Sequence, residues 1–518
     1  MASSDQRMRV DHKISRSARV FSHAFLVPLF CSIFLSALFS DFIPTAFGAY
    51  ADQRFFQCLL MVVVIVASLL WSDITVADEE LVVSIWPNLL IAAGFLVLSV
   101  PYAFSAFNWV EPGLFAIYFL AFAVLGWRIR GLDISRYAVE LFVIVAAIAC
   151  FFYAAMTMTV YLFAITDRFS ELTDVIPWGF VNMRYWSHLA TWLLPIMPLA
   201  LLVGPFVDNR KWQWCVSFSA AIWWWMVFMT TARGTMLGLA LAVVVAILFF
   251  GKMLIPWARI FGRFILFGGI AWVLLSVLIP SFVFEEVTVR SLHSDSSGRL
   301  PLWREAWLMS FQNFPWGLGP QSWLTHESIS GQDQLKIKLG HPHNMYLMWA
   351  AEYGWLVIAA IFVLVMRFIK NLLVRAGQLR FDPAESPTGL VVLTVSAVAG
   401  MIHAGVSAVF IVPASMLVGL CVLSLFWALS TPSADVVSPS DPTKTEGLRG
   451  SVFRMTLAAV VLSAGALWVK EVWDYHQAME ADLVRYEQGS YAPFFPRFWF
   501  HGNFPRIEQG AGPAFAKD

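Results

Sequence analysis

Two histidines and an asparagine stand directly in front of an apolar run in the sequence GHPHNMYLMWAAEYGW, residues 340–355. Pro342 lacks a backbone N–H and suits the first position of a helix, which predicts that His343 and Asn344 lie in the first helical turn. The free amides and positive dipole end of that turn attract an anion such as a phosphate, and they disfavour protonation of His343. A neutral imidazole at this place is a candidate general base.

Two other interpretations of the histidine pair stay open. A zinc site at His341 and His343 lacks further ligands nearby, because no cysteine is close and His293 and His326 are scattered. Alternatively, both histidines only cap the helix. Glu352 lies in the same run, roughly 13 Å deeper along a helix, and is interpreted as a buried partner of an arginine or of the bundle rather than as a catalytic acid.

Further ionisable residues stand near the ends of other apolar runs. Arg184 and His188 open one run, Arg233 lies in the turn TTARGT between two runs, and His403 lies in the outer half of another. Such groups within membrane spans are costly and usually functional. Each alone has an ordinary explanation as an interfacial or core residue. Together with His343 they come from separate hairpins and are predicted on one side of a membrane.

The segment VTVRSLHSDSSGRLPLWREAW, residues 287–307, adds Arg290 and Arg299 to this group. After Gly298 the aromatic residues recur at intervals of three or four, which is typical of an amphipathic helix. This helix is expected either to lie flat on the outer leaflet or to pack on the protein itself. Both arrangements hold the two arginines near headgroup depth. The aromatic stripe consists of Trp303, Trp307, Phe311 and Phe314.

The elements that must position these residues are membrane helices. Of 518 residues, 59% are hydrophobic and 13% are charged, and the mean hydropathy is +0.70, which excludes a water-soluble core with a polar surface. The zero net charge argues against a nucleic-acid partner. All five cysteines fall in apolar stretches, so no disulfide framework is expected. The first apolar run has no small-residue cleavage site behind it and is predicted to be a retained helix.

Apolar runs long enough to cross roughly 30 Å of hydrocarbon predict an all-α polytopic protein with about 12–13 transmembrane helices. The distribution of Lys and Arg predicts a cytoplasmic N-terminus and places the longest loop and the tail outside. The expected spans are 21–43, 55–71, 81–100, 108–127, 137–160, 185–203, 213–230, 235–250, 264–280, 344–366, 389–410, 411–429 and 453–473.

These spans predict an order of segments along the chain. The longest loop is expected to carry the catalytic residues and short amphipathic helices. The predicted order is a cytoplasmic N-terminus (1–20), transmembrane helices 1–9 (21–280), an outer catalytic loop (281–342), transmembrane helices 10–12 (343–429), a cytoplasmic linker (430–452), a last transmembrane helix (453–473) and an outer tail (474–518).

Three blocks in succession resemble the signature region of the bacterial O-antigen ligase and polymerase superfamily, which includes protein O-oligosaccharyltransferases. They are SSGRLPLWREAW, NFPWGLGPQSW and HPHNMYLMWAAEYGWL. TTARGT is similar to the family's small-residue-plus-arginine motif, and residues 179–199 are similar to its Asn-rich stretch. The resemblance is strongest over about residues 175–430. One departure is that the family's "Gly-x-x-Gly-x-Gly" continuation is reduced here to Gly354.

The resemblance implies a GT-C-like glycosyltransferase that needs no metal or other cofactor. It implies that the enzyme lies in the bacterial inner membrane and moves a glycan from undecaprenyl pyrophosphate to an acceptor hydroxyl on the periplasmic side. His343 would activate that hydroxyl, and Arg233 and Arg299 would hold the pyrophosphate. Arg184 and Arg290 are added to the pyrophosphate site from their predicted depth. The predicted supporting residues are His341, Asn344, Glu352, His188 and His403.

The expected acceptor is lipid A-core, with the end of another glycan or a protein hydroxyl as alternatives. A flippase for lipid-linked sugars is a rival class, but it would place ionisable groups near the midplane on repeated broken helices. A structural scaffold leaves the outer arginines unexplained. The tail has no role that the sequence reveals. A groove for lipid tails or sugar rings, or else an ordinary aromatic belt, is predicted at Trp303, Trp307, Trp316 and Trp323.

Overall fold

The computed structural model describes a protein built from helices. It covers residues 16–43, 49–71, 78–102, 106–169, 171–284, 298–331, 339–381, 386–432, 444–488, 496–500 and 502. Within these residues there is no strand, and nine helical stretches are long and apolar enough to cross a membrane. The predicted all-α polytopic membrane fold is therefore confirmed.

The α-helices follow one another with short connections. Those before the long loop are α1 (Arg16–Phe21), α2 (Val27–Phe39), α3 (Ala49–Leu70), α4 (Asp78–Val97), α5 (Val110–Gly131), α6 (Ser135–Thr166), α7 (Leu172–Val175), α8 (Met183–Leu193), α9 (Arg210–Met229), α10 (Arg233–Phe250), α11 (Ile255–Trp272) and α12 (Ile279–Val283). Those after it are α13 (Arg299–Gln312), α14 (Ser322–Thr325), α15 (Met345–Phe381), α16 (Thr388–Ala404), α17 (Pro413–Ser430) and α18 (Lys444–Gln488).

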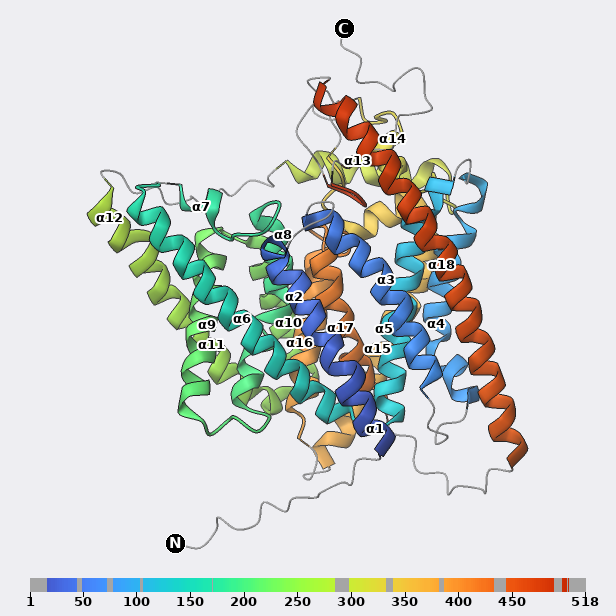
Figure 1. Cartoon of the computed structure of the whole chain (residues 1–518), viewed down its shortest axis with the longest axis horizontal. Coiled ribbons are helices and arrows are strands. Elements are labelled where there is room, and N and C mark those ends of the chain that lie inside the picture. Colours follow the sequence, from blue (N-terminus) through green and yellow to red (C-terminus); the bar gives the residue numbers. More distant parts are fainter. Residues whose placement is uncertain are drawn as a thin grey trace, which may run out of the picture.

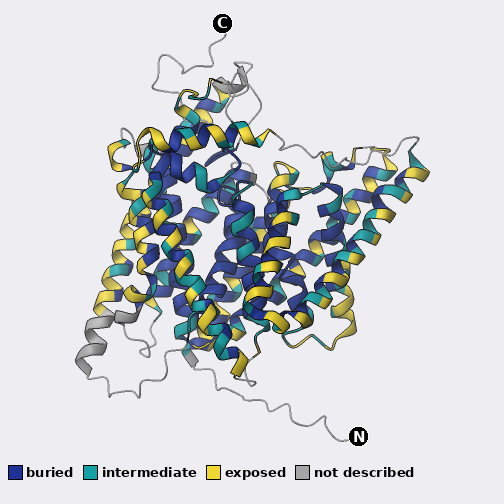
Figure 2. Cartoon of the chain, turned by 180° about the vertical axis from the view of Figure 1, so that it is seen from behind, coloured by how far each residue is buried: buried dark blue, intermediate teal, exposed yellow. Residues whose placement is uncertain are grey.

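The helices sort into a central group and an outer ring. In α17, 94% of the residues are buried, because the helix is apolar all round and packs against α2, α5, α8 and α16. Ring helices instead expose large apolar side chains, such as Leu248 at 75% and Phe362 at 62%. Figure 2 shows this distribution, with exposed residues along the outer faces and buried ones between the helices. Exposed apolar faces of this kind suit contact with lipid tails.

Three expected spans are less regular than the apolar pattern predicts. Run 185–203 is not one helix, because α8 ends at Leu193 and a separate 3-10 turn (Met197–Leu201) follows around Pro195 and Pro198. Run 389–410 forms the short helix α16, and α17 starts at Pro413. The last expected span is only the middle of α18, which continues to Gln488. Proline ends the helix in the first case because it cannot donate the next backbone hydrogen bond. In the second case α16 already ends at Ala404, before Gly405, and Pro413 occupies the first position of α17.

The two ends of the bundle differ (Figure 1). The short helix α1 lies at the lower end, whereas α13 lies across the upper ends of other helices, close to α14 and the end of α18. The helices α8, α10 and α15 start at this upper end, so their N-termini face α13. This arrangement brings segments that are far apart in the sequence to one side of the bundle.

Candidate active site

Three arginines stand at the starts of three helices. Arg184 is the second residue of α8, Arg233 is the first residue of α10, and Arg299 is the first residue of α13. Gly298 precedes Arg299 with φ +70°, a left-handed conformation that glycine adopts without strain, and so turns the chain into α13. Helix starts carry positive partial charge in addition to the side chains, so an anion is favoured there.

These arginines are close enough to affect one another. Burial lowers the pKa of Arg299, and the positive charges of Arg184 and Arg233 lower it further. Three like charges held together repel, and an anion placed among them would relieve that repulsion. The structure therefore brings together three of the four arginines predicted to bind pyrophosphate. The fourth, Arg290, lies outside the described residues.

His343 lies beside the arginines but not in a helical turn. It has φ +57°, and α15 begins only at Met345. The expectation that His343 and Asn344 form the first turn is therefore wrong. The reason is that the Asn344 side chain accepts the Leu347 N–H at 3.0 Å and caps the helix, which therefore begins three residues later than a start at Pro342.

The His343 side chain is buried, with 7% of its surface exposed. Burial lowers the pKa of His343 to about 3, with further contributions from the charges of Arg184 and Arg299. The imidazole is therefore neutral at physiological pH, as the sequence predicts, but because of burial and nearby guanidinium groups rather than the helix dipole. Its Nδ1 atom has no hydrogen-bond partner among the described residues. A neutral ring with a spare nitrogen can bond to a substrate hydroxyl.

His341 supports the backbone of this loop. Its ring stands at 84° to that of His343, with the centroids 4.4 Å apart, and its Nδ1 accepts the His343 backbone N–H at 3.1 Å. Nδ1 must then be unprotonated, which places the proton of the neutral ring on Nε2. Trp303 of α13 donates its indole N–H to the His343 carbonyl at 3.4 Å. Two neighbours thus hold the strained residue in place.

His188 and His403 form a second layer under the arginines. Their rings are 5.0 Å apart, and Ser407 and Thr191 each hydrogen-bond one of them at 2.7 Å. Gly234, the residue after Arg233, packs directly on His403, since an added Cβ would come 2.3 Å from the His403 Nε2 atom. Both histidines are buried and therefore shape the site from below rather than face a substrate.

The turn Pro315–Gly319 docks onto a kink in α15. Gly354 has φ +81° and ψ 170°, so the helix is interrupted there. The turn forms hydrogen bonds with the backbone groups of α15 that the interruption leaves without helical partners. Leu318 and Gly319 donate their N–H groups to the carbonyls of Ala351 and Glu352 at 2.9 and 2.8 Å. A Cβ on Gly354 would come 2.1 Å from the Pro315 carbonyl oxygen. These bonds fix α13 and α15 relative to each other.

Glu352 has the buried arginine partner that the sequence predicts, and that partner is in the tail. Arg497 donates to Glu352 at 2.6 Å and to both carboxylate oxygens of Glu111 at 2.7 and 2.8 Å. It also donates to the Gly340 carbonyl at 3.1 Å, next to His341. Sequence reasoning missed this network, because Arg497 and Glu111 are 386 residues apart and neither lies in a motif.

The predicted tryptophan groove is only partly present. Trp323 is completely buried and donates its indole N–H to the Leu339 carbonyl at 2.8 Å, so it holds the loop rather than a ligand. Trp307 and Trp316 are about half exposed, at 47% and 52%. In α13 the buried residues Leu302, Ala306 and Met309 pack against the protein, which agrees with the packed alternative for this helix. No described group of His, Cys, Asp or Glu is arranged to hold a metal ion.

Fold and site together define a class: a polytopic α-helical membrane protein with an arginine cluster and a neutral histidine beneath a helix outside the spans. Residues 218–362 match the family model described as O-antigen ligase, which confirms the predicted resemblance to that superfamily. The matched segment contains Arg233, Arg299 and His343. Members of this family are glycosyltransferase-like enzymes that act on lipid-linked glycans and acceptors. No curated protein and no solved structure shows a significant match.

Proposed function

We propose that this protein transfers a glycan from undecaprenyl pyrophosphate to an acceptor hydroxyl on the periplasmic side of a bacterial inner membrane, without a metal ion. The observation that carries the proposal is the convergence of Arg184, Arg233 and Arg299 with the unpartnered Nδ1 of His343. Lipid A-core is the acceptor we expect first. A growing glycan and a protein hydroxyl are the alternatives.

The arginines would bind the diphosphate of the donor. Guanidinium groups bind phosphate oxygens at two points and keep their charge at physiological pH. When the bond between the anomeric carbon and the diphosphate oxygen breaks, the electron pair stays with undecaprenyl pyrophosphate. The additional negative charge then develops among the three arginines, where it is stabilised most strongly.

His343 would accept the proton of the acceptor hydroxyl as its oxygen bonds to the anomeric carbon. Its pKa of about 3 makes the free ring a weak base. Bound diphosphate would offset the charges of Arg184 and Arg299, which are two of the causes of the low pKa, and would thereby raise it. Bound donor would therefore make His343 a stronger base. After glycan transfer, the proton on His343 would pass to water.

The test is transfer by the purified full-length chain in proteoliposomes that contain lipid-linked glycan. We expect His343→Ala to lower kcat by at least about a hundredfold, the usual contribution of a general base. His326→Ala is the matched control, since His326 is a half-buried histidine that follows α14, and it should keep full activity. Offering lipid A-core, free glycan and protein acceptors separately identifies the acceptor. Full activity of His343→Ala in a correctly folded protein would reject the proposed role.

A further inference from the structure

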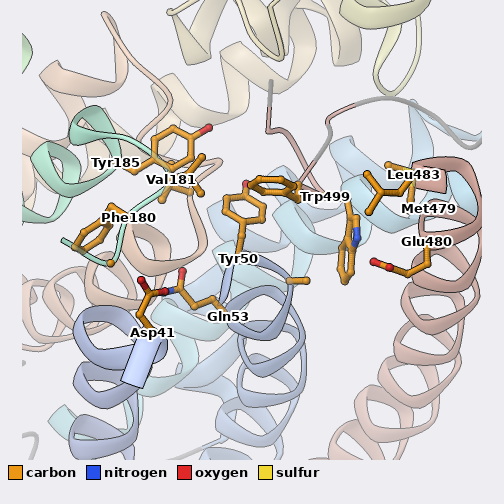
Figure 3. A pocket seen from close by; sticks show the side chains of 14 residues that line it. Asp41, Tyr50, Gln53, Phe180, Val181, Tyr185, Met479, Glu480, Leu483 and Trp499 are labelled. Atoms are coloured by element: carbon orange, nitrogen blue, oxygen red, sulfur yellow. The ribbon is translucent and has the colours of Figure 1, made fainter. Parts of the chain in front are cut away.

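A cavity of about 440 Å³ lies beside the arginine cluster, between the transmembrane helices and the tail. We call it the tail cavity and define it by Asp41, Tyr50, Gln53, Tyr185, Glu480 and Trp499, which are among the residues that line it. Its size is within the range of roughly 300–1,000 Å³ that is usual for small-molecule sites. Figure 3 shows Asp41 and Gln53 on one side of Tyr50, and Trp499 and Glu480 on the other.

The tail cavity shares a wall with the candidate active site. Tyr185 follows Arg184 on α8, and its ring stacks on that of His188 with centroids 6.0 Å apart. The opposite wall is the tail itself, which Arg54 and Tyr50 fix in place. Arg54 donates to the Phe498 carbonyl at 3.0 Å, and Tyr50 donates to the Arg497 carbonyl at 2.6 Å. A ligand in the cavity would therefore lie next to the site of transfer.

Acceptor groups in the cavity are left without partners. Gln53 is 6% exposed and donates its amide hydrogens to Ser36 and Ser40 at 3.0 and 2.8 Å. Its Oε1 atom makes no hydrogen bond with the described residues. The Asp41 carboxylate likewise has none among them, and Glu480 has only a distant contact of 3.8 Å to His476. Asp41 and Glu480 are exposed and can bond to water, whereas Gln53 is buried. A buried acceptor without a partner beside a cavity matches a ligand with hydroxyl donors.

The rest of the lining narrows the class of ligand. No Lys, Arg or His is among the described residues of the cavity, so a diphosphate has no cation to bind there. Aromatic rings of Tyr50, Phe180, Tyr185 and Phe500 supply flat apolar faces, against which the C–H groups of a sugar ring can pack. Two carboxylates disfavour a lipid tail, and they lie on opposite sides, which does not suit a single point cation (Figure 3).

We propose that the tail cavity is a carbohydrate subsite, which binds one sugar ring of the glycan on the donor or on the acceptor. The proposal rests on the proposed glycan transfer. Asp41, Gln53 and Glu480 accept hydrogen bonds from the ring hydroxyls, and the aromatic faces hold the ring. The C-terminal segment 496–500 thereby contributes to the choice of glycan.

The first test measures binding apart from activity. The probe is the oligosaccharide released from the lipid-linked donor by mild acid, added to the full-length chain in nanodiscs and followed by saturation-transfer NMR and equilibrium dialysis. Asp41→Ala/Glu480→Ala removes two acceptors and should weaken binding about tenfold or more. Glu171→Ala/Asp174→Ala is the matched control, because both are exposed carboxylates on the same side and outside the cavity. Val181→Trp, which fills the cavity, should also abolish binding.

The second test identifies the source of the sugar. In proteoliposomes, Asp41→Ala/Glu480→Ala should raise KM about tenfold or more for one substrate and leave kcat within about twofold of wild type. A rise for the donor assigns the cavity to the donor glycan, and a rise for the acceptor assigns it to the acceptor glycan. If the variant binds the probe as wild type does and its KM is unchanged for donor and acceptor, the subsite proposal is overturned. Glycan transfer by the wild-type chain would still support the proposed function. Specific binding without any transfer would reject the function and keep the subsite.

Discussion

At the scale of single residues, the arginine at the start of α13 allows a sharp test of how the diphosphate is held. Lys at position 299 keeps the charge but loses the planar fork that grips two oxygens. We expect Arg299→Lys to lower kcat/KM for the donor by about a hundredfold, since hydrogen bonds to charged groups contribute about 1.5–3 kcal/mol each. Arg304→Lys, at an exposed position of the same helix, should behave as wild type. Comparable donor kinetics in both variants would show that a point charge is sufficient.

The buried imidazole predicts an unusual pH profile. Burial and two arginines depress the pKa of His343 to about 3, so the base form persists as pH falls well below the usual histidine pKa of about 6.5. Activity should rise with pH through the operative pKa and stay level above it. The kcat/KM profile reports the free enzyme and kcat reports the donor complex. We therefore expect the acid limb of kcat at higher pH than that of kcat/KM, because bound diphosphate raises the pKa. If the acid limbs of the kcat and kcat/KM profiles coincide, bound donor does not raise the pKa of His343.

At the scale of elements, the buried guanidinium of Arg497 ties the tail to the bundle, in addition to the bonds from Arg54 and Tyr50. Asp and Glu are rarely buried without a partner, because an isolated charge is expensive to remove from water. Glu111 and Glu352 are both almost fully buried, and Arg497 forms an ion pair with each of them while it donates to the Gly340 carbonyl. The segment that precedes His343 is thus tied to a residue from the far end of the chain.

Replacing that guanidinium should separate stability from catalysis. Arg497→Met leaves two buried carboxylates unpaired and should destabilise the protein by about 3–5 kcal/mol, seen as a lower midpoint of thermal unfolding in nanodiscs. Adding Glu111→Gln and Glu352→Gln should restore most of that midpoint, because no orphan charge remains. The triple variant should still have a low kcat, since the Gly340 carbonyl has lost its donor. Arg304→Met serves as the surface control. A triple variant with normal kcat would argue that Arg497 is structural only.

At the scale of the whole molecule, the sequence predicted the features that depend on local patterns and missed those that depend on long-range contacts. The apolar runs identified the helices, and recognisable motifs at or near helix starts singled out Arg233, Arg299 and His343 as candidate site residues. The prolines in run 185–203 indicate that the helix breaks there, but the length of the apolar run favoured a single helix. In contrast, the pairing of Arg497 with Glu111 and the left-handed conformation of His343 arise from tertiary packing. A one-dimensional pattern has no period that reports such contacts.

The sidedness of the molecule follows from where its positive loops lie, and it can be tested directly. The exposed Lys252 lies in the 3-10 turn Gly251–Leu254 that follows α10, at the end opposite to Arg233, where that helix begins. Short loops rich in Lys and Arg stay in the cytoplasm, so we predict that the arginine–histidine site faces the periplasm. In a variant with the five native cysteines replaced by alanine, Glu171→Cys should react with a membrane-impermeant maleimide in spheroplasts. Lys252→Cys should react only after the membrane is permeabilised. The opposite labelling pattern would place the site in the cytoplasm, where an acceptor on the outer face of the membrane cannot be reached.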